Sequence, residues 1–161
     1  MFAEINEEKL FFSTINDETI VLEYGSGIST IEIAKKCKKI ISIEHQRNWY
    51  NDIKTKIPFN CEIILNEPNL PYKEGGHCGS YEEFKDYIEA PLNKGPFDVI
   101  LIDGRARVSC ASICHKISHK NTIIFIHDFD RPEYREALNY LELISQVGTM
   151  AKFKIKNDSI I

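Results

Sequence analysis

Long apolar segments are absent from the sequence, and neither sign of charge is in large excess. No run approaches the roughly 18 consecutive apolar residues of a transmembrane helix, so we expect no membrane span. Twenty basic and 24 acidic residues give a formal net charge of −4. This balance argues against non-specific nucleic-acid binding through the field of the whole protein. Residues 1–8 are acidic and lack an apolar stretch, so we expect no secretory signal.

Cysteine is scarce, and no two cysteines stand at CxxC spacing. There are five, an odd number: Cys37, Cys61, Cys78, Cys110 and Cys114. In a chain without a secretory signal this pattern indicates reduced thiols and a cytoplasmic location. The length of 161 residues lies in the range of about 100–200 residues that is usual for one domain. We therefore expect a single domain over residues 1–161.

Short runs rich in β-branched residues alternate with longer amphipathic segments. The runs are nearly continuous in apolar residues, which is typical of strands covered on both faces in a parallel sheet. They predict strands at 20–22, 40–43, 63–65, 99–102 and 123–126, with helices near 7–13 and at 30–39, 48–56, 81–88 and 132–141. Residues 142–147 and 150–155 predict an antiparallel hairpin. The expected fold is α/β: a doubly wound, mostly parallel sheet with helices on both faces and a C-terminal antiparallel hairpin.

One segment, residues 66–79, interrupts this alternation. It contains Pro68, Pro71, Gly75, Gly76 and Gly79 and predicts a long loop. Long loops in compact domains are often lids or binding loops, and plain surface insertions are an equally good explanation. We therefore consider residues 66–90 either a lid insertion or an ordinary surface insertion.

The most informative segment follows the first predicted strand and opens a helix. It reads Glu23-Tyr24-Gly25-Ser26-Gly27-Ile28-Ser29-Thr30. Gly25 permits a sharp turn, and Gly27 lets a ligand approach the backbone closely. The helix that follows presents free N–H groups and the positive end of its dipole. Glu44, at the end of the second predicted strand, is placed to accept hydrogen bonds from two ribose hydroxyls.

Two residues separate this pattern from that of a dinucleotide site. Thr30 stands where such a site prefers a third glycine, and Glu23 would repel a nearby pyrophosphate. A cationic ligand would instead be attracted by both Glu23 and Glu44. S-adenosylmethionine has this character, because it carries an ammonium and a sulfonium group beside a ribose.

The segment 23–30 resembles motif I of the class I S-adenosylmethionine-dependent methyltransferases. Ile43-Glu44-His45 is similar to the acidic end of the second strand in this family, and residues 97–104 resemble its fourth-strand motif. The predicted hairpin matches the reversed last strand of the family. The resemblance extends over residues 20–155 and implies a Rossmann-like methyltransferase fold with S-adenosylmethionine as the cofactor.

The resemblance also implies which residues meet that cofactor. Glu23 and the glycine backbone would contact the methionine part, and Glu44 would hold the ribose. His45 would lie beside the adenine, while Asn66 or Glu67 would approach the adenine amino group. The full set expected to bind the cofactor is Glu23, Gly25, Ser26, Gly27, Thr30, Glu44, His45, Asn66 and Asp103.

Ligands of open α/β sheets lie beyond the carboxyl ends of the strands, so the reactive residues should follow the fourth and fifth strands. Methyl transfer is an in-line displacement, and the enzyme must chiefly position the acceptor. His127 is suited to act as a general base, with Asp103 orienting it or acting alone. Arg105 and Arg107 would either bind an acidic acceptor or pair with nearby carboxylates. The expected catalytic residues are Asp103, His127 and Asp128.

Two groups of residues are candidate metal sites. Asp103 with His127-Asp128 is similar to the layout of magnesium-dependent O-methyltransferases, which carry an Asp-Asn pair after strand five. Histidine departs from that pattern, and because magnesium prefers oxygen ligands we do not favour a divalent metal. The alternative is that His127 and Asp128 have only a structural role, in which they cap the next helix or pair with Arg131. A second group recurs at helical spacing, but without CxxC spacing and with apolar neighbours it favours a core-facing helix over zinc: Cys110, Cys114, His115 and His119.

The predicted function is methyl transfer from S-adenosylmethionine to a small-molecule acceptor at oxygen. Two alternatives stay open: a nucleotide- or NAD-binding Rossmann protein, and a non-catalytic cofactor-binding module. No basic groove and no Asn/Asp-Pro-Pro-Tyr motif for flipped bases is apparent, so we expect no nucleic-acid partner. The acceptor pocket would have to come from residues 66–90 or from a second subunit in a homodimer.

Overall fold

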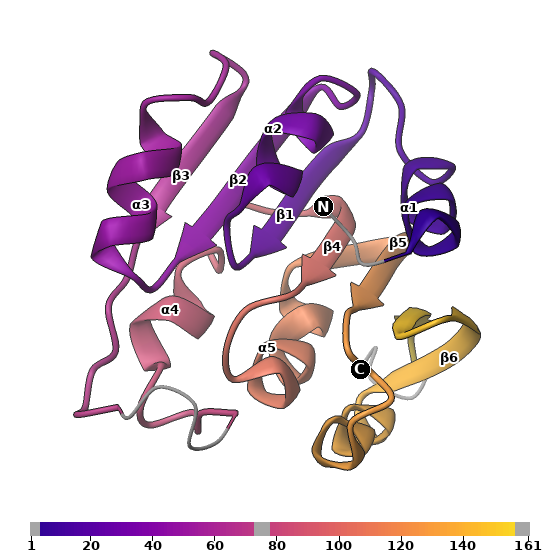
Figure 1. Cartoon of the computed structure of the whole chain (residues 1–161). Coiled ribbons are helices and arrows are strands. Elements are labelled where there is room, and N and C mark those ends of the chain that lie inside the picture. The colour runs from indigo at the N-terminus through magenta and orange to yellow at the C-terminus, as the bar shows by residue number, and fades with distance from the viewer. Residues whose placement is uncertain (1–3, 73–77, 157–161) are drawn as a thin grey trace.

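A seven-stranded sheet in the order β3-β2-β1-β4-β5-β7-β6 forms the centre of the molecule (Figure 1). The computed structural model describes residues 4–72 and 78–156. The strands are β1 (Ile20–Tyr24), β2 (Lys39–Glu44), β3 (Cys61–Leu65), β4 (Phe97–Ile102), β5 (Ser118–Ile126), β6 (Leu141–Val147) and β7 (Met150–Ile155). The five strands predicted from β-branched runs and the closing hairpin are all confirmed.

Strand direction distinguishes this sheet from a dinucleotide-binding one. Strands β1 to β5 pair in parallel, whereas β7 pairs antiparallel with both β5 and β6. The dinucleotide-binding sheet has the order 3-2-1-4-5-6. Here β7 is inserted between β5 and β6, so the last three strands depart from that order.

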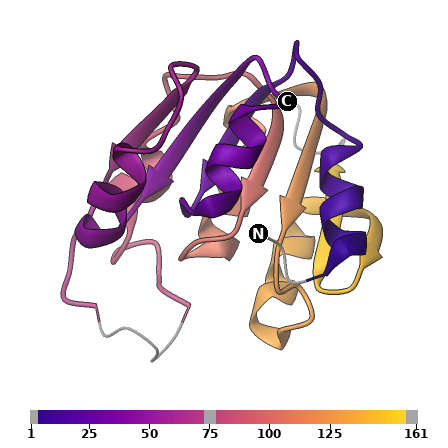
Figure 2. The ribbon, with the colours of Figure 1, turned by 45° about the horizontal axis from the view of Figure 1, so that its top comes forward.

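Helices cover both faces of the sheet (Figure 2). One face is covered by α1 (Ile5–Phe12) and α2 (Ile28–Ala34), which pack Phe11 and Ile33 into one apolar cluster; α3 (Arg47–Lys54) lies on the same side. The other face is covered by α4 (Lys85–Glu89), α5 (Arg107–Ile113) and the 3₁₀ segment η2 (Pro132–Asn139). A short 3₁₀ turn, η1 (Cys114–Lys116), follows α5. Among the described residues, no helix is long and apolar enough to cross a membrane.

The predicted helices exist, but their lengths and types differ from the predictions. Helix α2 ends at Ala34, because the chain must reach β2 at Lys39. The segment after Pro132 is a 3₁₀ helix and not an α-helix. In the predicted core-facing helix, the buried Cys110 lies on α5 and the buried Cys114 on η1, whereas His119 lies on β5.

The segment 66–90 is only partly an insertion. Phe84, Tyr87 and Ile88 are fully buried in the core, and the Tyr24 hydroxyl donates a hydrogen bond to the Ile88 carbonyl at 2.7 Å. The expected lid is therefore wrong for residues 84–90, which are built into the fold by their apolar side chains. The glycine pair Gly75-Gly76 lies outside the described residues.

Side-chain alternation along the strands decides which polar groups share a face. Val21, Leu101 and Phe125 point toward α1 and α2, where they join the cluster that contains Phe11. Successive strand residues point to opposite faces, so the residues two positions further point the same way. These are Glu23, Asp103 and His127. The sheet thus places three polar side chains from β1, β4 and β5 on the face that α1 and α2 cover.

Candidate functional site

An open cleft of about 570 Å³ lies at the carboxyl ends of the parallel strands. This is the edge at which open α/β sheets bind their ligands, and the volume is that of a small-molecule site. The cleft is lined by the loops after β1, β2, β4 and β5 and by the first turns of α2 and α3: Gly25, Ser26, Gly27, Ile28, Ser29, Glu44, His45, Gln46, Trp49, Asp103, Gly104, Arg105, Arg107, Asp128 and Arg131.

The glycine turn is shaped by two different constraints. Gly25 has φ +93°, a backbone conformation that would be strained for any residue with a side chain. A Cβ on it would also lie only 2.7 Å from the Gly104 Cα, so there is no space for one. Gly27 is extended, and a Cβ there would meet only the Ser29 hydroxyl, at 3.7 Å. Its N–H donates to the Thr30 hydroxyl at 2.8 Å. Gly25 therefore closes the turn against the β4 loop, while Gly27 keeps the floor of the cleft accessible.

Glu44 lines the cleft, and protein donors already surround its carboxylate. Oε2 accepts the Ser26 N–H at 3.0 Å and the Ser26 hydroxyl at 2.6 Å. Oε1 accepts the N–H groups of His45 and Gln46, each at 2.8 Å. Burial acts to raise the pKa of Glu44, but the hydrogen bonds from His45, Ser26 and Gln46 outweigh it and lower the pKa. Glu44 is therefore held as an oriented carboxylate at the end of β2.

Two buried polar groups beside Glu44 have no hydrogen-bond partner among the described residues. They are the His45 ring, neither of whose nitrogens has such a partner, and the Oδ1 atom of Asn66. The His45 Nδ1 atom lies 3.1 Å from Glu44 Oε1, and the ring packs edge-on against Phe84 and Tyr87. Unpaired buried polar atoms are costly without a ligand or water. Of the two, His45 lines the cleft and Asn66 does not.

Glu23 does not line the cleft, which differs from the sequence prediction of cofactor contact. Its carboxylate is fully buried beneath the glycine turn and accepts hydrogen bonds from Ser42 (2.6 Å), Thr30 (2.6 Å) and Ser29 (3.1 Å). Burial raises the pKa of Glu23 to about 7, against the opposing effect of these hydroxyls. Glu23 and Thr30 therefore shape the turn from below, where strand alternation points the Glu23 side chain toward α2.

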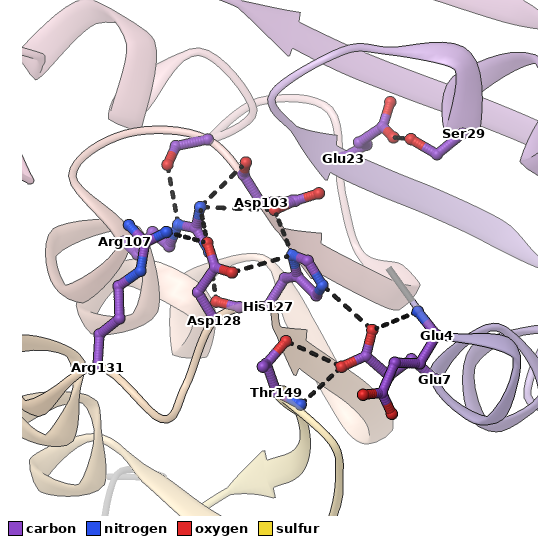
Figure 3. A network of polar contacts seen from close by, with 11 residues as sticks. Glu4, Glu7, Glu23, Ser29, Asp103, Arg107, His127, Asp128, Arg131 and Thr149 are labelled. Carbon is purple, nitrogen blue, oxygen red and sulfur yellow. Dashed lines mark hydrogen bonds and ion pairs between the residues drawn. The ribbon is translucent and has the colours of Figure 1, made fainter. Parts of the chain in front are cut away.

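Residues after β4 and β5 form a dense network of charges (Figure 3). Arg107 Nη2 lies 3.1 Å from Asp128 Oδ2 and 3.5 Å from Asp103 Oδ1, and Arg131 reaches the same Asp128 oxygen at 3.1 Å. Arg107 also donates to the His127 carbonyl. Asp128 adopts φ +54°, a left-handed conformation that is uncommon outside glycine. This turn directs Asp128 toward Arg107 while His127 points to the other face.

His127 is half-buried between carboxylates and is not among the residues that line the cleft. Its Nδ1 lies 3.1 Å from Asp103 Oδ1, and its Nε2 lies 3.4 Å from Glu7 Oε2. Burial acts to lower the pKa of His127, but Asp103, Asp128 and Glu7 outweigh it and raise the pKa. Both ring nitrogens are directed at carboxylates. The structure therefore argues against the predicted role of His127 as a general base, whereas Asp103 and Asp128 both line the cleft.

The arrangement of Asp103, His127 and Asp128 resembles a metal site only in its spacing. One ligand atom from each lies within 4.8 Å of the others. The Arg107 guanidinium, however, already pairs with both carboxylates, and the Nδ1 atom of His127 is directed at Asp103. A divalent cation would have to displace a fixed cation and break these pairs. The donor set fits an internal ion-pair cluster better than a metal.

The second group considered for a metal is dispersed. Cys110 and Cys114 are fully buried in the core. His115 is bound through Nδ1 to the Ser112 carbonyl, and His119 pairs with Asp98 at 2.9 Å on β5. Within the described ranges, Asp103, His127 and Asp128 are the one group of three potential ligand side chains found close enough for a metal.

Sequence reasoning missed three residues of this site. Trp49 is 41% exposed and lines the cleft from α3, with its indole N–H donated to the Ser26 carbonyl. Gly104 touches Gly25 and leaves room for Tyr87. Glu7 contacts His127 from α1. Trp49 could have been suspected from its place shortly after Glu44, whereas the other two depend on tertiary contacts.

Known proteins provide an independent comparison. No family model matches the chain. A stretch of 60 residues is 45% identical to the probable ribosomal RNA small subunit methyltransferase A of Methanococcus aeolicus. This match covers 34% of the chain and 22% of that relative, so it spans less than a quarter of the relative's length.

Solved structures match over nearly the whole chain. A methyltransferase-like protein from Silicibacter pomeroyi superposes with a TM-score of 0.72 and 23% identity, covering 97% of this chain and 88% of that one. A TehB-like S-adenosylmethionine-dependent methyltransferase from Corynebacterium glutamicum superposes with a TM-score of 0.63 and 13% identity, covering 95% and 89%. The chain has the class I methyltransferase fold. In this chain the loops after β1, β2 and β4 line the cleft described above. The loop after β1 is the segment that resembles motif I of that family.

Proposed function

We propose that this chain transfers the methyl group of S-adenosylmethionine to a small-molecule acceptor, at oxygen. The observation that carries the proposal is the cleft itself, which brings the open Gly27 backbone, the Glu44 carboxylate and the Asp103 carboxylate together at one edge of a class I methyltransferase sheet. The unpaired thiols support a cytoplasmic location for this activity.

Glu44 is the residue we assign to the cofactor ribose. Its oxygens are saturated by four donors, so a ribose hydroxyl must take the place of the Ser26 hydroxyl on Oε2. The Ser26 side chain can rotate away without disturbing the backbone bonds. His45 and Asn66, with their unpaired buried atoms, then hold the adenine. When bound, S-adenosylmethionine supplies an electrophilic methyl group on its sulfonium.

Asp103 is the residue we assign to the acceptor. It lines the cleft, and its Oδ1 atom is fixed by His127 and lies near Arg107. A carboxylate fixed in this way accepts the hydrogen bond of an acceptor hydroxyl and takes its proton as the oxygen is methylated. Holding the acceptor in line with the sulfonium is the larger part of the rate enhancement expected.

Ribosomal RNA is the second candidate acceptor, because of the 45% identical stretch shared with a ribosomal RNA methyltransferase. The loop after β4 reads Asp103-Gly104-Arg105 and not Asn/Asp-Pro-Pro-Tyr. The nearest approach to that motif, Asn69-Leu70-Pro71-Tyr72, follows β3. Its Tyr72 ring packs against Phe84 at 4.9 Å between ring centroids. These features favour the small acceptor.

Transfer of a radiolabelled methyl group distinguishes the two acceptors. The purified chain is incubated with labelled S-adenosylmethionine and either a low-molecular-mass cell extract or ribosomal RNA, each with and without EDTA. We expect label in the small-molecule fraction, and loss of that label in Asp103→Asn. Because Arg107 stands between the acidic groups, EDTA should not reduce the transfer. Label in RNA alone would assign the second acceptor, and no transfer to either would support a non-catalytic module.

A further inference from the structure

Glu7 is a fully buried carboxylate on α1 that the cleft does not include. Its Oε1 atom accepts the N–H of Thr149 at 2.6 Å and the Thr149 hydroxyl at 2.9 Å. Its Oε2 atom accepts the N–H of Glu4 at 3.3 Å. The β6–β7 turn is shaped around this group, because a Cβ on Gly148 (φ +56°) would lie 2.6 Å from Glu7 Oε1. One carboxylate thus joins the N-terminal helix to the C-terminal hairpin.

The same carboxylate reaches the site through His127 (Figure 3). Glu7 Oε2 lies 3.4 Å from the Nε2 atom of His127, and the opposite ring nitrogen lies 3.1 Å from Asp103. The imidazole therefore bridges a buried acid on α1 and the acid that lines the cleft. Both ring nitrogens face an acidic partner, so the orientation of the ring is fixed from two sides.

Docking of α1 does not by itself require a buried charge. Phe11 on the same helix is fully buried and packs against Phe125 of β5, with ring centroids 5.1 Å apart. Removing a carboxylate from water costs free energy unless it is well paired, and an apolar residue of similar size would serve packing as well or better. An apolar residue would leave both the Thr149 donors and the His127 ring without the acceptor that Glu7 supplies. The carboxylate of Glu7 therefore serves the β6–β7 turn and the ring together.

We propose that Glu7 is a positioning residue, which orients the Asp103 carboxylate in the cleft by fixing the His127 ring. The role of Asp103 toward the acceptor rests on the proposed function, whereas the link from Glu7 through His127 to Asp103 does not. Glu7 itself touches no ligand. Its effect on methyl transfer passes through the two residues between it and the cleft.

The test compares Glu7→Gln with Glu8→Gln, its neighbour on the same helix. The first readout is the pH titration of ¹⁵N-labelled histidine rings by NMR, with His127 assigned from a His127→Gln variant. We expect the His127 ring to lose its proton at a lower pH in Glu7→Gln than in the wild type and in Glu8→Gln, because the carboxylate beside Nε2 is then gone. This readout needs neither cofactor nor acceptor. It therefore decides the link even if the chain proves to bind no S-adenosylmethionine.

The second readout is methyl transfer to the acceptor found above. We expect Glu7→Gln to lower kcat by about tenfold to a hundredfold with the affinity for S-adenosylhomocysteine unchanged. Combined with Asp103→Asn, it should lower kcat no further than Asp103→Asn alone. If Glu7→Gln fails to fold, Thr149→Val removes one donor to Glu7 and should shift the His127 titration in the same direction. A Glu7→Gln variant that only melts earlier, with the His127 titration and kcat of Glu8→Gln, would overturn the proposal.

Discussion

Glu23 and Glu44 are buried carboxyls at the ends of neighbouring strands, yet their surroundings drive their pKa values in opposite directions. Burial raises the pKa of Glu23 to about 7, because three hydroxyl donors compensate only partly. The pKa of Glu44 is lowered despite burial, since backbone N–H groups of the turn also point at it. Glu44 is thus kept ionised for a ligand. Glu23 is a structural group, and its ionisation lowers the free energy of unfolding of the protein.

Replacing Glu23 by Gln should change how stability depends on pH. The folded pKa of Glu23, about 7, lies above its ordinary value of 4.5, so the unfolded chain loses this proton first as pH rises. Wild-type stability should therefore fall between pH 4.5 and 7 by up to about 3 kcal/mol from this group, and by no more above pH 7. Glu23→Gln lacks this loss. Denaturant unfolding at pH 5 and pH 8 measures the difference.

The control for this prediction is Glu32→Gln, which removes a solvent-accessible carboxylate from α2. Relative to wild type, Glu23→Gln should gain stability between pH 5 and pH 8, and Glu32→Gln should not. If the two variants show the same pH dependence, burial does not govern the pKa of Glu23.

Trp49 offers a direct optical signal for ligand binding. It is the sole tryptophan of the chain, it lines the cleft, and it is 41% exposed. A cofactor in the cleft should cover the indole, so S-adenosylhomocysteine should shift the emission to shorter wavelength and reduce quenching by acrylamide. The same titration of Trp49→Phe should give no signal. If saturating ligand left the emission wavelength and the quenching of the wild type unchanged, the ligand would bind elsewhere.

At the scale of elements, the loops after β1 and β4 are in contact through glycine. A Cβ on Gly104 would overlap the Tyr87 hydroxyl and lie 3.0–3.1 Å from the Gly25 backbone. Gly104→Ala should therefore destabilise the fold by about 1–3 kcal/mol, as overpacking does. In a Tyr87→Phe background the cost should shrink, because the hydroxyl is gone. Thermal unfolding of both single variants and the double variant measures this coupling.

Gly27→Ala is the matched control for that prediction. Its backbone is extended, and the added Cβ would meet only the Ser29 hydroxyl at 3.7 Å. The melting temperature of Gly27→Ala should stay near that of the wild type. Equal destabilisation of the two alanine variants would show that space at the β1–β4 contact is not the cause.

Elements differ in how far the sequence predicts them. Strands β1 to β5 were predictable because fully buried parallel strands need continuous apolar runs. Helix ends were less so, since α2 stops at Ala34 to let the chain reach β2, and residues after Pro132 take a 3₁₀ form. The helix α4 was predicted near its place, at 81–88, but the inclusion of these residues in an insertion over 66–90 missed their burial in the core.

At the scale of the whole molecule, the site combines local and distant residues. Gly25, Gly27 and Glu44 were predictable because a ligand-binding turn and the acid of the next strand are close in sequence. The role of Glu7 was not, since its partners His127 and Thr149 are 120 and 142 residues away in the chain. The sequence predicted cofactor contact for Glu23 and a general-base role for His127, but neither side chain lines the cleft, because alternation turns both toward the helices, which only the assembled sheet reveals.

The central claim is that the cleft binds S-adenosylmethionine through Glu44. Calorimetric titration of the wild type with S-adenosylmethionine, S-adenosylhomocysteine and NAD tests it most directly, together with Glu44→Ala and, as control, Glu32→Ala, whose side chain is accessible and pairs with Lys35. We expect one site for each of the first two ligands, no binding of NAD, and a loss of about 1–3 kcal/mol in Glu44→Ala alone. Tight binding of NAD with none of S-adenosylmethionine, or full affinity in Glu44→Ala, would contradict the account.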